Sequence, residues 1–315
     1  MRADEHNPGR PDERPCIGFI GLGNMGGPMC RRLVDAGYDV IAFDIDTAAL
    51  AAAAARGADP AESAAACASR VDVLLTSLPR PDHVESVLRD GGALAALRPG
   101  SMWIDLTTNR KELVFELAGE APPGVHVVDS PVTGAVDGAR NGRLTLFIGG
   151  SDEDVARARP VLGHLGLVIH CGPLGTGNVV KLVTNQLWFV AAAAIGEGFA
   201  VGLANGVELG TLWNAITESV GDSFVARHDA PSIFAGHYDP SFSLDLCLKD
   251  LNLIAELAGN VGASLPMTDA ARGAFQTAAD RYGPSAAELH VARRIEDDAK
   301  LSMRLDGDWT PPWEQ

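Results

Sequence analysis

Residues 21–26 read GLGNMG, a G-x-G-x-x-G pattern between a predicted strand, CIGFI, and a predicted helix, GGPMCRRLVDAG. In this context the first glycine permits a tight turn, the second lets a phosphate approach the backbone, and the third lets the helix pack on the strand. The helix N-terminus adds N–H donors and a partial positive charge. The alternative is a tight strand-to-helix turn without a ligand. The pattern favours a site for the pyrophosphate of a dinucleotide, formed by Gly21, Leu22, Gly23, Asn24, Met25 and Gly26.

An acidic residue, Asp44, ends the next predicted strand, within VIAFDID. Asp44 follows the glycines by roughly 20 residues. An acidic residue at this distance typically binds the ribose hydroxyls of a dinucleotide. A 2′-phosphate would meet the negative charge of Asp44, and the next basic residue, Arg56, follows only at the far end of the predicted helix. The sequence therefore predicts NAD in preference to NADP. The alternative is that Asp44 caps the following helix.

A single lysine, Lys181, lies in the otherwise uncharged stretch GPLGTGNVVKLVTN, which is typical of the start of a buried helix. Burying an amine costs free energy, so this position needs a reason. Asn185 follows at i+4 and shares the helix face of Lys181. The alternatives are a lysine that extends its ammonium to solvent and a core amide that satisfies its own hydrogen bonds. Gly175 and Gly177 favour the functional interpretation, because they allow close backbone approach at the start of the helix.

The elements that position these residues follow from the apolar pattern. From Cys16 to near Cys171, helical stretches alternate with the short apolar runs CIGFI, DVIAFD, VDVLLTSLP, SMWIDLTT, VHVVDSPV, LTLFIGG and LVIHCG. This alternation predicts an α/β, Rossmann-type, doubly wound parallel sheet covered on both faces. Beyond Cys171 the apolar residues recur at three- and four-residue steps, which predicts an all-α C-terminal domain.

We therefore expect four segments in the 315 residues. Residues 1–15 form a polar, disordered lead-in, and residues 16–173 form the dinucleotide-binding domain. Residues 174–300 form an all-helical domain for substrate binding and oligomerisation. Residues 301–315 form a C-terminal tail whose tryptophans suit docking on a surface, for example that of a neighbouring subunit.

Composition excludes several classes of function. With 25 basic and 41 acidic residues the net charge is −16, which repels nucleic acid and anionic membranes. The five cysteines are scattered and the histidines show no ligand spacing, so we assign neither disulfides nor a metal. The N-terminus lacks an apolar signal segment, and the most apolar run, FVAAAAIGEGFAVGLA, contains Glu197 and is too short to span a bilayer. We expect a cytoplasmic protein without a membrane partner.

Six stretches occur in one order along the chain: IGFIGLGNMGGPM, LPRPDHVESVL, IDLTT, DSPVTGAVDGARNG, GPLGTGNVVKLVTN and FSLDLCLKDLNL. Together they resemble the β-hydroxyacid dehydrogenase family, which includes 3-hydroxyisobutyrate dehydrogenase and tartronate semialdehyde reductase. The resemblance covers roughly residues 16–300. The ordered set is far more specific than any one of its motifs.

The resemblance implies that Lys181 is the catalytic acid and base and that Asn185 faces the same site. In reduction, the ammonium of Lys181 would protonate the carbonyl oxygen as a hydride leaves the nicotinamide; in oxidation, the neutral amine would take the proton back. The resemblance also places Lys249 against cofactor and substrate, with Asp250 holding the local helix. Because a free lysine titrates above pH 10, we expect burial or a nearby cation such as Lys249 to lower the pKa of Lys181.

One loop departs from the family pattern, which usually shows Ser-Gly-Gly where this chain has Thr133, Gly134 and Ala135. A hydroxyl and backbone N–H groups in such a turn can bind a substrate carboxylate. Thr133 keeps the hydroxyl but adds a methyl group, and Ala135 keeps the N–H but disfavours backbone angles open to glycine. We expect a pocket reshaped for an unusual substrate, or for one without the usual carboxylate. The alternative is a plain glycine-rich loop.

Four further residues fall at the ends of predicted strands, where an open α/β sheet binds its ligand. They are Leu78, Pro79, Thr107 and Thr108. By resemblance they contact the nicotinamide half of the cofactor. Either pair could instead be a helix cap or a loop breaker.

These observations predict an NAD-dependent oxidoreductase that transfers a hydride between nicotinamide and a small β-hydroxyacid or its semialdehyde. One alternative is an imine reductase or another carbonyl reductase with an altered pocket; Lys181 argues against the former class, which replaces this lysine. The other is a catalytically silent cofactor-binding protein, which the joint presence of Lys181, Asn185 and Lys249 disfavours. The long apolar helix beginning near Gly177 predicts subunit pairing as a homodimer or homotetramer.

Overall fold

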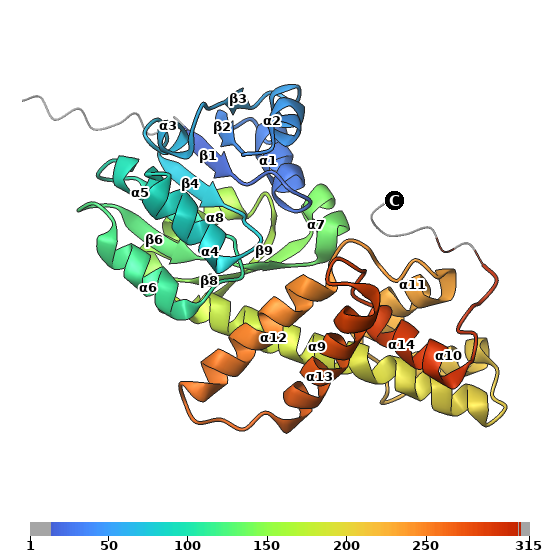
Figure 1. The fold of residues 1–315 in the computed structure, drawn as a ribbon. Coiled ribbons are helices and arrows are strands. Elements are labelled where there is room, and N and C mark those ends of the chain that lie inside the picture. The colour runs from blue at the N-terminus through green and yellow to red at the C-terminus, as the bar shows by residue number, and fades with distance from the viewer. Residues whose placement is uncertain (1–13, 308, 310–315) are drawn as a thin grey trace, which may run out of the picture.

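A computed structural model describes residues 14–307 and 309. In these residues nine strands form one sheet, in the order β3-β2-β1-β4-β5-β6-β8-β7 with β9 paired to β8. Figure 1 shows the sheet in the first half of the chain and the helices of the second half beside it. The strands are β1 (Ile17–Ile20), β2 (Val40–Phe43), β3 (Asp59–Pro60), β4 (Val73–Thr76), β5 (Met102–Asp105), β6 (His126–Asp129), β7 (Val132–Thr133), β8 (Leu144–Gly149) and β9 (Gly166–Gly172).

Strands β1 to β6 are parallel, and the chain changes direction across the sheet between β1 and β4. The carboxyl ends of these strands meet at one edge, which is where ligands bind in sheets of this kind. The predicted α/β class is confirmed. The short strands β3 and β7 have no signal in the apolar pattern, because each contains only two residues.

One part of the sheet differs from the predicted parallel arrangement. Strand β8 runs antiparallel to both β6 and β7. Only residues 134–143 connect β7 to β8, and most of them form α7 (Ala135–Asn141). A parallel crossover needs a dozen or more residues, so this short connection returns the chain in the opposite direction. Strand β9, reached through α8 (Asp152–Leu162), is again parallel to β8.

Helices cover both faces of the sheet because successive strand residues point to opposite sides. Phe19 and Leu75 pack with α1 and α8 on one face, whereas Ile20 and Leu74 pack with α3, α5 and α6 on the other. The remaining elements of this domain, in chain order, are α1 (Gly26–Asp35), α2 (Thr47–Ala54), α3 (Ala64–Ala68), α4 (Pro81–Glu85), the π-helix η1 (Ser86–Asp90), α5 (Ala93–Ala96) and α6 (Lys111–Glu120).

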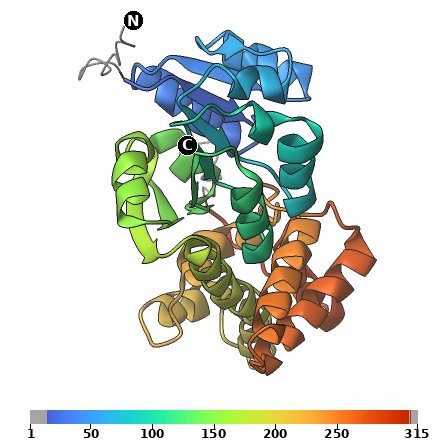
Figure 2. The same ribbon diagram turned by 90° about the vertical axis from the view of Figure 1, so that its left-hand side faces the viewer.

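The second half is helical over the described residues, as predicted. Its longest helix, α9, leaves the sheet domain and runs through the helical domain, where α12, α13 and α14 pack on it (Figures 1 and 2). Its elements are α9 (Thr176–Ala204), α10 (Leu209–Thr217), the π-helix η2 (Val225–Asp229), α11 (Ala230–Ala235), α12 (Leu244–Gly259), α13 (Pro266–Tyr282) and α14 (His290–Ala299).

Helix α9 is long and apolar enough to cross a membrane by length and composition alone, although core helices of soluble proteins pass the same test. Only 28% of its most apolar stretch is buried in the single chain. Val183, Leu187 and Val201 are exposed on it, Leu187 by 67%. This helix therefore presents apolar surface that the single chain does not cover.

The ends of the chain were predicted to be a disordered lead-in and a docking tail. Residues 1–13 of the lead-in lie outside the described residues. In the tail, Met303 is fully buried, and Trp309 packs edge-on against Trp213 and Phe234 of the same chain. The described part of the tail thus docks on its own helical domain; residues 308 and 310–315 lie outside the described residues.

Candidate active site at the domain junction

The three glycines of the GLGNMG turn have different surroundings. A Cβ atom added to Gly21, whose φ is +95°, would lie 2.2 Å from the Ser77 carbonyl oxygen, and one added to Gly26 would lie 1.9 Å from the Gly21 carbonyl oxygen. A Cβ added to Gly23 would meet nothing within 4 Å. The outer glycines therefore close the turn between β1 and α1, while the middle one leaves open space. That space fits a pyrophosphate at the start of α1.

Asp44 follows β2 at the same edge of the sheet and binds the glycine turn. Its Oδ2 accepts a 2.5 Å hydrogen bond from the backbone N–H of Leu22, and its Oδ1 accepts one of 2.8 Å from that of Asp46. The N-cap of α2 is Asp46, whose side chain accepts from the Ala48 N–H. Asp44 is therefore not the helix cap, and Arg56 lies beyond the last residue of α2.

The residues after β4 and β5 form adjoining loops at this edge. The Thr107 hydroxyl accepts a hydrogen bond from the Leu78 N–H at 3.0 Å, and Thr107 is buried. Thr108 and Leu78 are half-buried, and Pro79 is exposed. Thr107 thus holds one loop to the other, whereas Leu78, Pro79 and Thr108 remain at the accessible end of the sheet.

Two buried carboxylates that the sequence analysis did not single out join the sheet to α9. Asp129, at the end of β6, accepts hydrogen bonds from the N–H groups of Gly175 at 2.6 Å and Asn178 at 2.7 Å. Asp105, at the end of β5, accepts one from the Asn109 amide at 2.9 Å, and the Asn109 N–H donates to the Asn178 side chain at 2.7 Å. Both aspartates lie within predicted strand runs and are the last residues of the observed strands. A position at the carboxyl end of a parallel strand is the signal that could have identified them.

Burial raises the pKa of Asp129 to about 6, although the N–H donors of α9 oppose the shift. The start of α9 also needs glycine, because a Cβ on Gly177 would lie 2.1 Å from the Phe147 carbonyl oxygen. The first turn of α9 is thus fixed tightly against the carboxyl edge of the sheet. This contact sets where the next turns of α9 point.

Lys181 lies on the next turn of α9 and is only 8% exposed. Burial lowers its pKa from 10.5 to about 8; the carboxylate of Asp250 opposes this shift, and the positive charge of Lys249 adds to it. The expected shift is confirmed in direction and in cause, with burial as the larger effect. An amine with this pKa populates both protonation states near neutral pH.

Asn185 lies one turn further along α9 and connects this helix to α12. Its side-chain amide donates a 2.7 Å hydrogen bond to Oδ2 of Asp250, and Nζ of Lys249 lies 2.9 Å from Oδ1 of the same carboxylate. Asp250 is buried, and the Lys249 side chain is 10% exposed. The structure therefore brings Lys181, Asn185 and Lys249 together around one carboxylate, with α9 and α12 as the two supports.

The Thr133-Gly134-Ala135 loop lies on β7 and at the start of α7, beside β8, against which α9 packs. Gly134 has a φ of +121°, and Ala135 has a φ of +55°. The chain thus keeps a left-handed backbone at Ala135 although glycine is absent. This conformation costs an alanine about 1 kcal/mol.

A further ion pair joins the domains near the site. The Arg80 guanidinium, directly after Pro79, pairs with Asp245 in the first turn of α12. No sequence motif indicates that Arg80 and Asp245 form a pair, because the two residues lie far apart in the sequence. Their pairing holds α12, and with it Lys249, toward the edge of the sheet.

Comparisons with known proteins agree with this arrangement. Residues 16–172 match the family model of the NAD binding domain of 6-phosphogluconate dehydrogenase, and residues 175–295 match the model described as NAD-binding of NADP-dependent 3-hydroxyisobutyrate dehydrogenase. A 3-hydroxyisobutyrate dehydrogenase of Pseudomonas aeruginosa is 36% identical over 269 residues, 82% of this chain and 90% of that protein. An NAD-dependent L-serine dehydrogenase of the same species is 35% identical over 80% of this chain and 88% of that protein.

Solved structures show the same fold. A Mycobacterium tuberculosis 3-hydroxyisobutyrate dehydrogenase with L-serine superposes with a TM-score of 0.83 and 32% identity, over 90% of this chain and 99% of that one. An imine reductase from Myxococcus stipitatus reaches a TM-score of 0.61 at 20% identity, over 90% of this chain and 99% of that one. The second likeness concerns the fold alone.

Proposed function

The chain belongs to the β-hydroxyacid dehydrogenase family, and on that premise we propose that it oxidises a small β-hydroxyacid with NAD, or reduces the matching semialdehyde, with Lys181 as acid and base. The observation that carries this proposal is the buried amine of Lys181, whose pKa is lowered to about 8. A lysine at a solvated helix edge would keep its ordinary pKa. The site therefore favours proton transfer over a structural role.

In the oxidative direction, the neutral amine of Lys181 accepts the proton of the substrate hydroxyl. In the reductive direction, its ammonium donates a proton to the carbonyl oxygen. A pKa of about 8 serves both directions, since neither form is rare near neutral pH. The Asp250 carboxylate holds Asn185 and Lys249 beside the amine, and these two supply donors that orient the substrate oxygen.

The nicotinamide cofactor supplies the hydride acceptor or donor when it is bound. Residues 21–26 would hold its pyrophosphate, since only Gly23 among the three glycines faces open space. Asp44 would bind the adenosine ribose, and Leu78, Pro79, Thr108 and Lys249 would contact the nicotinamide half. The Asp44 charge, with Arg56 beyond the end of α2, supports NAD in preference to NADP.

The names of the relatives suggest the substrate class. 3-Hydroxyisobutyrate and L-serine, named for two of them, both carry a primary alcohol on the carbon β to a carboxylate. We propose a substrate of this class, with the backbone N–H groups and hydroxyl of Thr133-Gly134-Ala135 as the carboxylate site. The methyl groups of Thr133 and Ala135 leave less space for substrate beside this loop. We therefore propose that the substrate carries a small substituent on its α-carbon.

The test is NAD-linked turnover against a panel of β-hydroxyacids and semialdehydes, with wild type and Lys181→Ala side by side. We expect the variant to lose at least about 100-fold in turnover, as for loss of an acid/base group, while NADH still binds with unchanged affinity. Turnover that survives in Lys181→Ala would remove the lysine from the mechanism.

The same panel, extended to cyclic imines, separates the alternatives. NADH oxidation with cyclic imines but not with semialdehydes would favour an imine reductase, and tight NADH binding without turnover on any compound would favour a silent binding protein. Lys181 and the family membership favour neither.

We also propose that two copies of the chain pair through the helical domain, as a homodimer or within a homotetramer. The exposed apolar surface of α9, including Leu187, supports this because a large apolar patch on a soluble chain marks an interface. Sedimentation of wild type and Leu187→Glu at micromolar concentration tests it. A monomeric wild type would refute the proposal.

A further inference from the structure

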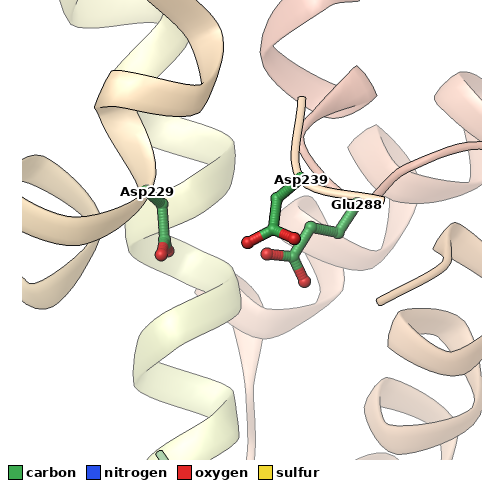
Figure 3. Close-up of side chains that lie close together, drawn as sticks. All are labelled: Asp229, Asp239 and Glu288. Atoms are coloured by element: carbon green, nitrogen blue, oxygen red, sulfur yellow. The ribbon is translucent and has the colours of Figure 1, made fainter. Parts of the chain in front are cut away.

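Three carboxylates that the proposed mechanism does not use gather inside the helical domain. Asp229 ends η2, Asp239 lies in the loop after α11, and Glu288 lies just before α14. One oxygen of each lies within 4.8 Å of one oxygen of each of the others, and all three residues are buried. Figure 3 shows Asp239 and Glu288 side by side, with their carboxylates facing the side on which Asp229 lies.

Glu288 is the residue that makes this cluster unusual. It is 3% exposed, and its Oε2 accepts no hydrogen bond within the described part of the chain. Burial raises its pKa well above the usual range, and the charges of Asp229 and Asp239 raise it further. A buried carboxylate without a donor costs free energy unless a positive group or a proton joins it.

The other two carboxylates are held in place from outside the cluster. Asp229 accepts hydrogen bonds from Trp188 Nε1 at 2.7 Å and pairs with His228 Nδ1 at 2.9 Å. Asp239, at a φ of +53°, accepts from the N–H of Ser241 at 2.9 Å. Donors of this kind orient carboxylates that bind a metal, and they leave lone pairs for the ion.

We propose that Asp229, Asp239 and Glu288 bind one divalent metal ion of the oxygen-preferring class, with Ca²⁺ as the best fit. Hard cations take carboxylate oxygens as ligands, and Ca²⁺ does so at about 2.4 Å. Two ligands on opposite sides of Ca²⁺ are then about 4.8 Å apart. The three carboxylate oxygens all lie within that distance of one another, so one ion can contact all of them. Mg²⁺ usually keeps several waters and binds one or two carboxylates, so a buried set of three carboxylates suits it less well.

The ion would join three segments that are far apart in sequence. It would fasten the end of η2 and the loop after α11 to the start of α14, and Trp188 would connect these to α9. Its role is therefore structural, in the domain that positions Lys181. The proposal is independent of the dehydrogenase activity, because its test measures binding and stability.

The experiment uses the full chain, treated with chelator and then titrated with Ca²⁺, Mg²⁺ and Mn²⁺ by calorimetry and thermal unfolding. We expect Ca²⁺ to bind at one site per chain and to raise the midpoint of unfolding. Glu288→Gln keeps the shape of the side chain and removes one ligand charge, and we expect it to lose at least about tenfold in affinity. Glu153→Gln, which changes an exposed carboxylate, is the matched control for cations attracted by the net charge.

A second readout locates the ion. Because Trp188 donates to Asp229, Tb³⁺ in the site should show luminescence on excitation of tryptophan, and Glu288→Gln should lose that signal while Glu153→Gln keeps it. If no ion binds below millimolar concentration, or if both variants bind Ca²⁺ like wild type, the proposal is wrong. Glu288 then carries a proton that it shares with its neighbours, and Glu288→Gln should fold with unchanged or higher stability.

Discussion

Replacing Lys181 with methionine should abolish turnover and at the same time stabilise the fold near neutral pH. The burial that lowers the pKa of Lys181 from 10.5 to about 8 is a penalty on the charged form in the folded state. This shift corresponds to ~3 kcal/mol at pH 7. Methionine fills a similar volume without a charge, so the variant avoids that penalty.

The gain must depend on pH in one direction. Between pH 8 and 10.5 the unfolded chain holds more protons on Lys181 than the folded chain does, so the wild type gains stability as the pH rises through this window. The difference between Lys181→Met and wild type should therefore be largest below pH 8. This difference in stability should fall by roughly half by pH 9.5. Above the pKa of Lys181 in the unfolded chain, only the pH-independent difference in side-chain packing should remain.

The assay is urea unfolding of both proteins at pH 7.0, 8.5 and 9.5, with Lys300→Met as the control because Lys300 is exposed. Groups distant from Lys181 titrate alike in the two proteins and cancel in the difference. A Lys181→Met protein that is less stable than wild type at pH 7, or a difference that stays constant with pH, would refute the interpretation of a desolvated amine. Lys300→Met should change stability by less than about 0.5 kcal/mol at each pH.

Three further outcomes follow from the site. Gly26→Ala should destabilise the sheet domain by about 3 kcal/mol in urea unfolding, because its Cβ would collide with backbone atoms. Gly23→Ala, whose Cβ would meet no protein atom, should fold normally but weaken NADH binding in a fluorescence titration. Asp44→Asn with Ile45→Arg, at a site 89% exposed, should shift the ratio of kcat/KM for NAD and NADP by roughly 100-fold toward NADP; an unchanged ratio would contradict the ribose assignment. Ala135→Gly should relieve the left-handed backbone and leave stability within about 1 kcal/mol, while lowering KM for a carboxylate substrate; a KM that does not move would remove this loop from substrate binding.

Much of the fold was open to prediction because its signals are local. Alternating apolar runs placed the seven longer strands, and the three-to-four-residue period placed the helical domain. The glycine turn could be identified because its motif lies within a few residues of β1 and α1. There, backbone contacts require glycine at positions 21 and 26, and Gly23 leaves open space. Lys181 and Asn185 could be paired because four residues along one helix always share a face.

Other features were decided only when distant segments met. The reversed direction of β8 depends on the length of one connection, and the apolar pattern of a strand is the same in either direction. Asp250 serves both Asn185 and Lys249, and Asp129 caps α9 from the end of β6; no spacing along the chain encodes either contact.

The carboxylates of Asp229, Asp239 and Glu288 illustrate the same limit. Their spacing along the chain does not resemble that of metal ligands, because the three acids are scattered over 60 residues (229–288). The sequence by itself determined the class of fold, the cofactor turn and the buried lysine, because periodicity and short motifs act within one element. The tertiary structure decided which charges lie together, because burial and distance, and with them every pKa and every candidate ion site, exist only after the elements have packed.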